Sequence, residues 1–73
     1  MKFQVALWKE EEMYIIREVF TGVTTQGKSI EEAINNLKEA MELYLEEKPE
    51  VMEEIMGVET LGTLNVEITK AVR

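Results

Sequence analysis

The sequence predicts an α+β domain with the element order β-β-β-α-β, in which a four-stranded mixed sheet carries one long helix on one face. Two observations predict this class. Apolar residues alternate with polar ones over residues 2–9 and again after residue 60, as they do in strands. Between these runs, from Ser29 to Lys48, apolar residues recur every three or four positions, which is the period of a helix packed on one side.

The first two strands are predicted over residues 2–9 and 13–20. In the first strand, every second residue from Phe3 to Leu7 is apolar and marks one face, while Trp8 falls on the other face. The second strand is apolar on both faces, although a strand with one face in water should alternate apolar and polar residues. We therefore expect something to cover both sides of this strand.

A short third strand is predicted over residues 23–26, and Gly27 turns the chain toward the helix. Ser29 and Glu32 form an S-x-x-E capping box, in which the two side chains satisfy free backbone N–H groups of the first turn. Pro49 ends the helix, because the residue before a proline is disfavoured in the α region. The apolar stripe that should face the sheet consists of Ile30, Ala33, Ile34, Leu37, Ala40, Met41 and Tyr44.

Residues 50–56 are predicted to form a short helical turn, and residues 61–72 the last strand. A strand, a helix and a further strand in one sheet make a crossover, which is right-handed in almost all proteins. We therefore expect strand four to lie beside strand one and parallel to it, which gives the strand order 3-2-1-4.

Four short motifs carry a resemblance to a known family. They are GVTTQGKS at residues 22–29, EEA at 31–33, LKEA at 37–40 and LYL at 43–45. Together with the two strands before them, they resemble the N-terminal domain of the HicB-like antitoxins of type II toxin–antitoxin systems. The resemblance implies a truncated ribonuclease H-like fold and a small basic ribonuclease toxin as partner. Many members carry a DNA-binding segment after this domain, whereas we expect a single HicB-like domain over residues 1–73 with none appended.

The residue types exclude most catalytic chemistry. The chain has no His, no Cys and no Asp, so all 15 acidic residues are Glu. Imidazole bases, thiolate nucleophiles and transition-metal sites are therefore excluded. Glu18 and Glu67 fall in predicted strands, but two isolated glutamates do not make the carboxylate cluster of a two-metal nuclease. We expect no catalytic residue, no metal site, no cofactor and no enzymatic activity.

The chain is acidic, with a net charge of −7 over 73 residues. Proteins that hold nucleic acid by themselves present clustered Lys and Arg to the phosphates, so we expect no direct binding of nucleic acid. An acidic surface instead attracts a basic partner. No apolar run approaches the roughly 18 residues of a membrane span. The absence of Cys suits a reducing compartment, and we expect a cytoplasmic protein.

Apolar residues without a place in a one-helix core are the candidate partner-binding residues. Trp8, Met13 and Ile15 are expected on the sheet face away from the helix, where they would serve as anchors. Leu43 lies about 120° from the centre of the helix stripe and is a lesser candidate. The charged rim of this interface would consist of Glu39, Glu42, Glu46 and Glu47. In the alternative interpretation, residues 50–56 fold back and cover this surface.

Two functions from different classes remain open. The first is a non-catalytic, antitoxin-like interaction protein that binds and neutralises a small basic ribonuclease toxin; the activity of that partner comes from the resemblance alone. The second is a stand-alone homo-oligomeric HicB-like protein without a toxin partner, which assembles through the apolar sheet face or through exposed strand edges. A homodimer is the default expectation, because closed two-fold dimers are the commonest oligomers.

Overall fold

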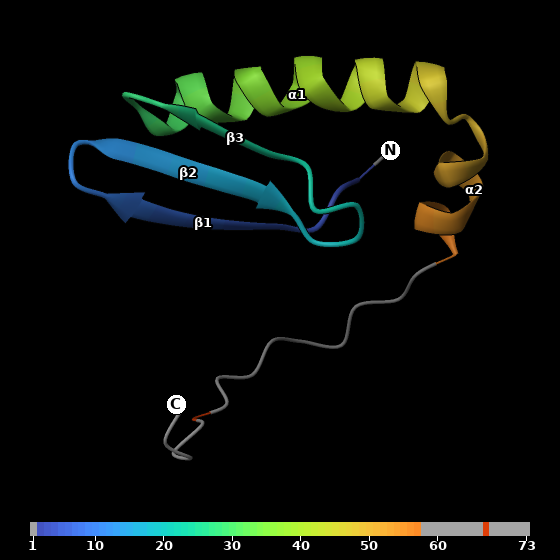
Figure 1. Cartoon of the computed structure of the whole chain (residues 1–73), viewed down its shortest axis with the longest axis horizontal. Coiled ribbons are helices and arrows are strands. Elements are labelled where there is room, and N and C mark those ends of the chain that lie inside the picture. Colours follow the sequence, from blue (N-terminus) through green and yellow to red (C-terminus); the bar gives the residue numbers. More distant parts are fainter. Residues whose placement is uncertain (1, 58–66, 68–73) are drawn as a thin grey trace, which may run out of the picture.

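The structure is a computed structural model that describes residues 2–57 and Glu67. These residues form three strands followed by two helices (Figure 1): β1 (Val5–Glu10), β2 (Met13–Glu18), β3 (Thr24–Gly27), α1 (Ile30–Glu47) and α2 (Glu50–Met56). The fold is α+β, with α1 lying along one face of the sheet and α2 turning away from the end of α1. The predicted last strand, residues 61–72, falls outside the described residues apart from Glu67.

The described sheet is antiparallel and has the strand order β1-β2-β3, which agrees with the first three strands of the predicted order. The register places Trp8 opposite Ile15 and Leu7 opposite Ile16 in the β1–β2 pair. It places Ile15 opposite Gln26 in the β2–β3 pair. Directly opposed residues share a face of the sheet, so Leu7 and Ile16 point to one side and Trp8 and Ile15 to the other.

The strand bounds differ from the prediction. β1 begins at Val5 rather than at residue 2, β2 ends at Glu18 rather than at residue 20, and β3 is shifted by one residue. The chain leaves β2 through a tight turn, in which Gly22 has a φ of 79° and donates its N–H to the Glu18 carbonyl at 2.9 Å. Val19 and Phe20, which were predicted to continue the strand, lie in this turn and are exposed.

A buried carboxylate holds the turn after β2. Glu18 is only 1% exposed, and its Oε1 accepts hydrogen bonds from the backbone N–H and the hydroxyl of Thr21 at 2.6 and 2.7 Å. The Thr21 hydroxyl also lies 3.8 Å from the sulfur of Met41 in α1. A buried carboxylate is tolerated only when its oxygens are hydrogen-bonded. Glu18 therefore has a structural role, which connects the end of β2 with α1.

The helix α1 begins and ends as predicted. The Ser29 hydroxyl oxygen accepts the N–H of Glu32 at 3.1 Å. The Glu32 carboxylate reaches back to the N–H of Lys28 at 2.6 Å, one residue before the partner expected in a capping box. At the other end the helix stops at Glu47, with Lys48 as its C-cap. Both ends are thus set by the residues that predicted them.

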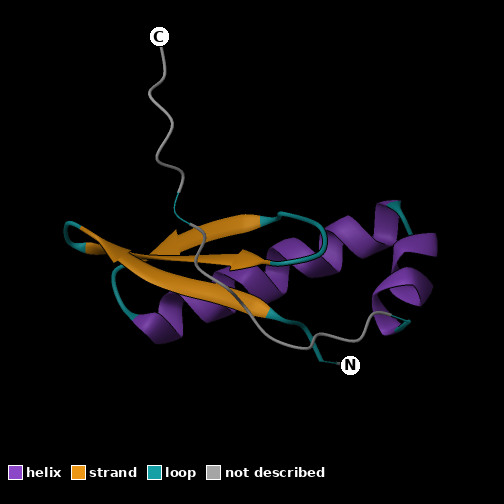
Figure 2. Cartoon of the chain, turned by 90° about the horizontal axis from the view of Figure 1, so that it is seen from below, coloured by secondary structure: helices purple, strands orange, loops and turns teal. Residues whose placement is uncertain are grey.

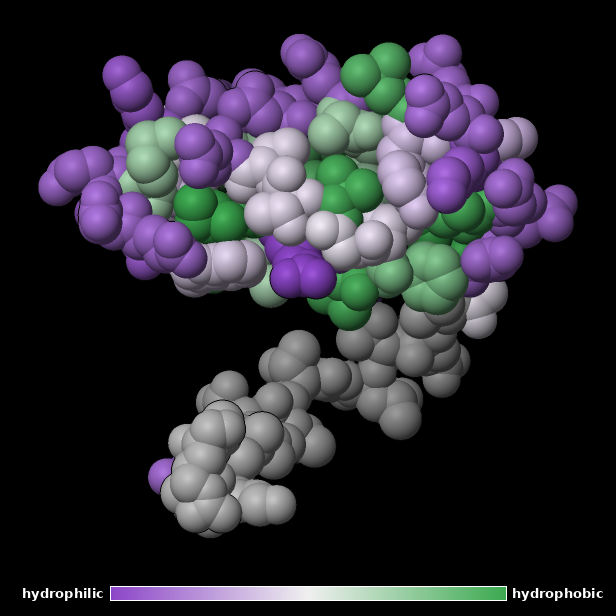
Figure 3. Space-filling model, in the orientation of Figure 1, coloured by the Kyte–Doolittle hydropathy of each residue, from purple (hydrophilic) through white to green (hydrophobic). Residues whose placement is uncertain are grey.

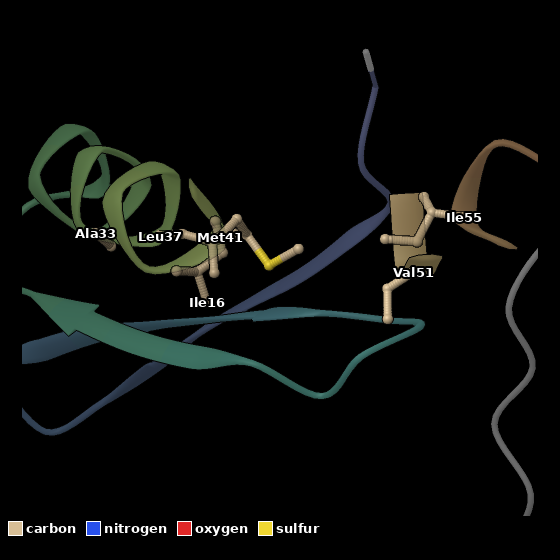
Figure 4. Packing of buried hydrophobic residues seen from close by; sticks show 6 residues of the cluster. All are labelled: Ile16, Ala33, Leu37, Met41, Val51 and Ile55. Atoms are coloured by element: carbon tan, nitrogen blue, oxygen red, sulfur yellow. The ribbon is translucent and has the colours of Figure 1, made fainter. Parts of the chain in front are cut away.

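The core lies between α1 and the sheet and extends to α2 (Figure 4). Its buried apolar residues are Ile16, Ala33, Leu37, Met41, Val51 and Ile55. Two residues of the predicted stripe, Ile30 and Ile34, are instead 43% and 37% exposed. The reason is that α1 packs over β3 and β2 rather than over β1, because a helix about 10 Å wide covers only about two strands spaced about 4.8 Å apart. The prediction gave the direction of the stripe correctly but made it too wide.

Gly27 allows β3 and the first turn of α1 to pack closely. A Cβ atom at this position would lie 2.5 Å from the backbone nitrogen of Ala33, which is far inside van der Waals contact. Two hydrogen bonds reinforce the junction. The Thr25 hydroxyl donates to the Ala33 carbonyl at 3.1 Å, and the Asn36 amide donates to the Gln26 carbonyl at 2.8 Å. Together these contacts fix the position of α1 on the sheet.

Replacement of Gly27 with Ala should destabilise the domain by about 1–3 kcal/mol, the usual range for overpacking against atoms that cannot move aside. Gly57→Ala is the matched control, because a Cβ atom at Gly57 would meet its nearest neighbours at 3.6 Å, an ordinary contact. Urea unfolding followed by circular dichroism measures both variants. Equal midpoints for the two variants would contradict this account of Gly27.

Candidate binding surfaces

The sheet face that points away from α1 carries three of the candidate residues. This outer sheet face comprises Ala6, Trp8 and Glu10 of β1, Met13, Ile15 and Arg17 of β2, and the polar Thr24 and Gln26 of β3. Trp8 lies directly opposite Ile15 across the β1–β2 pair. Figure 2 shows this side of the sheet in front, with α1 behind it and α2 beyond its end. The short helix does not fold back over the face, because its buried side chains join the core on the other side of the sheet.

Trp8 is the largest side chain of the outer sheet face and is 38% exposed. Its indole N–H donates to the Glu10 carboxylate at 2.7 Å. Because this is the only donor of the side chain, a surface that covers the ring leaves no polar atom of the indole unpaired. Glu10 and Arg17 are the two charged residues of the face and have opposite signs. The outer sheet face is therefore neutral, although the chain as a whole has a net charge of −7.

The remaining candidates lie on the side of α1 that points away from the sheet. This acidic helix face comprises Leu43 together with Glu39, Glu42, Glu46 and Glu47. All five side chains are exposed, and Leu43 is 64% exposed. Figure 3 shows hydrophilic side chains along the outer side of α1, at the top of the view, and more apolar ones nearer the sheet. The face thus presents one apolar side chain among carboxylates.

The structure divides the candidate residues between two sides of the molecule. The core lies between the sheet and α1, so it separates the outer sheet face from the acidic helix face (Figures 1 and 2). One flat interface cannot have both Trp8 and Leu43 at its centre. The binding roles of these residues stay predictions, but they belong to two surfaces rather than to an apolar centre with an acidic rim.

Two of the four glutamates of the acidic helix face, Glu46 and Glu47, lie in the last turn of α1, where negative charge is least favourable. The helix dipole places roughly half a negative charge at the C-terminus, and the last turn contains Glu46 and Glu47 but no basic residue. The short helix α2 follows at once and adds Glu50 and Glu53 in its first turn. Helix stability alone would favour Lys or Arg at the end of α1. The arrangement therefore concentrates negative potential at one end of the molecule.

An apolar groove runs between β1 and α1, and the sequence analysis did not anticipate it. It has a volume of about 320 Å³ and is lined by Phe3, Val5, Leu7, Ile16, Ile34, Leu37 and Lys38. A hollow of about 230 Å³ adjoins it and is lined by Phe3, Lys38, Met41, Glu42 and Leu45. Val5, Leu7 and Ile34 have the sequence spacing of core residues, but they are exposed because α1 does not cover β1. Among the described residues β1 pairs only with β2, so its other edge, along the groove, has no described strand beside it.

Residues 2–57 and 67 contain no group of three His, Cys, Asp or Glu side chains that could hold a metal ion. Glu18, one of the two glutamates considered for nuclease chemistry, is hydrogen-bonded to Thr21 in the turn after β2. Its carboxylate therefore stabilises this turn. Neither described helix has the length and apolar character needed to cross a membrane.

Comparison with known proteins places the chain among small proteins of unknown function. A family of unknown function (DUF7387) matches residues 2–70. A UPF0150 protein of Archaeoglobus fulgidus is 41% identical over 64 residues, which cover 84% of this chain and 93% of the relative. A UPF0150 protein of Thermoplasma acidophilum is 42% identical over 48 residues, covering 63% of this chain and 70% of the relative. One of Helicobacter pylori strain J99 is 46% identical over 46 residues, covering 62% and 64%. No solved structure matches the chain significantly.

Charge reversal at the two ends of α1 should have opposite effects on stability. Glu47→Lys should raise the free energy of unfolding by about 0.3–1 kcal/mol, because it places a cation at the helix C-terminus. Glu31→Lys changes the net charge equally but should lower the free energy of unfolding by a similar amount, because Glu31 lies in the first turn. Thermal unfolding at low ionic strength measures both variants. A loss of stability in Glu47→Lys would mean that this glutamate supports the fold.

Proposed function

The chain belongs to the UPF0150 proteins, a family of unknown function (DUF7387), and we propose that it is a non-catalytic, antitoxin-like protein that binds and neutralises a small basic ribonuclease. The resemblance of residues 22–45 to HicB-like antitoxins supports the class of partner. The net charge of −7 supports the basic character of that partner. The proposal includes a cytoplasmic location, where such a toxin would meet its RNA.

The acidic helix face is the observation that carries the proposal. Its four exposed glutamates lie around Leu43, the most exposed large apolar side chain of α1. Their negative potential would steer a basic protein to this end of the molecule and raise the association rate. In most interfaces a few buried anchors within a polar surround supply most of the affinity. Leu43 has the surroundings of such an anchor.

Nucleic acid is a poorer fit to the same surface, because its phosphates would be repelled by the glutamates. Two of the described lysines lie over aromatic rings. Lys9 lies over the ring of Tyr14 at 5.4 Å and Lys48 over the ring of Tyr44 at 5.7 Å, on different elements. We therefore propose a protein rather than a nucleic acid as the partner.

The finer fold prediction remains part of this proposal. It adds a fourth strand, parallel to β1, to complete a truncated ribonuclease H-like sheet. The open edge of β1 and the apolar groove beside it leave room for such a strand. A strand in that position would also cover Val5 and Leu7, whose spacing is that of core residues.

A stand-alone self-assembling protein is the second candidate function. The observation that favours it is the outer sheet face, which is apolar at its centre and electrically neutral. This second candidate does not need a toxin partner. The two candidates use different surfaces of the molecule, so one protein can have both properties.

The product of an adjacent reading frame that encodes a short basic protein is the probe for the proposed function. We expect the two proteins to form a complex in which the ribonuclease activity of the basic protein is lost. Leu43→Ala should weaken binding by about 1–2 kcal/mol, the loss typical of an interface anchor. Absence of a complex at micromolar concentrations, or a complex in which the toxin stays fully active, would contradict the proposal.

A pair of matched double variants tests whether the acidic helix face guides association. Glu42→Gln with Glu46→Gln should slow association clearly, because both charges lie on that face. Glu12→Gln with Glu31→Gln makes the same change in net charge at exposed positions elsewhere and should change the rate by less than about twofold at physiological salt. Stopped-flow mixing measures both rates. Equal slowing by the two double variants would mean that net charge alone guides the encounter.

The purified protein should not cleave RNA or DNA in the presence of magnesium or manganese, because two-metal hydrolysis needs a cluster of carboxylates. Gel assays on the monomer and dimer fractions measure this. Glu67→Gln is the informative variant, since Glu18→Gln would also disturb the turn after β2. Cleavage that co-elutes with the protein and disappears in Glu67→Gln would prove this prediction wrong.

A further inference from the structure

We propose that the outer sheet face is the contact between two copies of this chain, which pack sheet against sheet as a two-fold dimer. The inference goes beyond the proposed function, because it assigns a surface that the basic partner does not use. It rests on the apolar centre of the face, its neutral charge and the internal hydrogen bond of its tryptophan.

The apolar centre of the face comes from β2. Ile15 points to the outer sheet face and Ile16 to the core, so this strand is apolar on both sides. Strands of an antiparallel sheet with one face in water usually carry polar residues on that face. Trp8, directly opposite Ile15, and Met13 extend the apolar surface across two strands. Such a face is suited to pack against a second sheet about 10 Å away.

The charge distribution favours a second copy over a basic partner on this face. Two copies that each carry a net charge of −7 repel each other, and contact through the acidic helix face would bring the carboxylates together. The outer sheet face carries one glutamate and one arginine, so two such faces can meet without net charge repulsion. A basic protein would find no excess of negative charge on it. Its neutrality therefore points to self-association.

The positions of the two charges are self-complementary. Glu10 lies at the hairpin end of the β1–β2 pair and Arg17 near the opposite end, with the Trp8–Ile15 pair midway. A two-fold axis that crosses the strands at this midpoint reverses the strand direction between the two sheets. It therefore places Arg17 of each copy over the Glu10 end of the other, as an isologous contact requires.

The hydrogen bond between the Trp8 indole and Glu10 removes an obstacle to burial of this face. The indole N–H already donates to an acceptor in the same chain, so covering the ring does not leave this donor without a hydrogen bond. The face is nevertheless small. Two strands of six residues and one of four, about 4.8 Å apart and with about 3.4 Å per residue, give roughly 260 Å², against about 800 Å² per partner in an interface of standard size. We therefore expect a dissociation constant in the micromolar range.

Sedimentation equilibrium of the full chain from about 5 to about 500 μM covers the range expected for so small an interface. The average mass should rise from 8.5 kDa toward twice that value. Trp8 is the only tryptophan, so its fluorescence emission should shift to shorter wavelength as the dimer forms.

Two substitutions in the outer sheet face and one matched control test whether this face forms the dimer contact. Trp8→Ala removes the largest side chain of the face, and Ala6→Lys places a long charged side chain at an exposed position without removing any core contact. Each should weaken dimerisation at least about tenfold, as loss of a central anchor does. Leu43→Ala removes an exposed apolar side chain on the other side of the molecule and should leave dimerisation unchanged.

A mass of 8.5 kDa at every concentration would overturn the proposal. So would a dimer that forms equally well in Ala6→Lys and leaves the Trp8 emission unshifted, because the β1 edge or the groove would then be the contact. If the product of the adjacent basic frame shifts the Trp8 emission and dissociates the dimer, the outer sheet face belongs to that partner and the proposal is wrong. A dimer that meets all expectations while no basic partner binds would support this inference and contradict the proposed function.

Discussion

The close contact between β3 and the first turn of α1 determines most of the remaining structure. Gly27 leaves room for the backbone of Ala33, and hydrogen bonds from Thr25 and Asn36 hold the two elements together. This contact keeps α1 over β3 and β2. One helix cannot also cover a third strand, since its width matches about two strands. The uncovered β1, the exposed Ile34 and the groove between β1 and α1 all follow from this single placement.

The two exposed surfaces differ in electrostatics, and this difference underlies the proposal of a different partner for each. The acidic helix face includes two glutamates in the last turn of α1, where the helix dipole disfavours them. The outer sheet face is neutral and apolar, which suits contact with an identical surface. The core occupies only the layer between α1 and the sheet, so both of these surfaces are exposed on a chain of 73 residues.

Local sequence patterns correctly predicted the features that are set by residues close together in the chain. The capping box at Ser29, the end of α1 before Pro49 and the order of the first three strands follow from spacing and turn residues, and the structure has them. The width of the buried stripe did not follow, because periodicity gives the direction of Ile30 and Ile34 but not how many strands a helix covers. The grouping of the candidate residues was missed for a related reason. The sequence predicts that Trp8 and Leu43 lie outside the core. Only the arrangement of the sheet and α1 in space shows that they lie on opposite sides of the molecule.

The burial of Glu18 could also not be predicted from the sequence. A glutamate at the end of a strand is normally solvated, and its burial depends on the turn that brings the Thr21 hydroxyl and N–H to its carboxylate. The signal that could have pointed to it is the alternation of β2, since Glu18 has the same phase as Ile16. A carboxylate is tolerated at this buried position only because Thr21, three residues further on, is oriented to donate hydrogen bonds to it.

The contacts between elements that are neighbours in sequence affect how the chain folds during its synthesis. Each described element packs against its neighbour in sequence, and the one additional contact joins α1 to β2. Folds built from such near-neighbour contacts form quickly, and a ribosome adds only about 5–20 residues per second. The β1–β2 hairpin therefore leaves the ribosome before α1 exists to cover it. A two-stranded hairpin is marginal by itself, so its apolar side chains stay accessible until the helix has been synthesised. Residues 1–28 contain four basic and four acidic residues, so the negative charge that keeps chains apart in solution appears only when α1 has been synthesised.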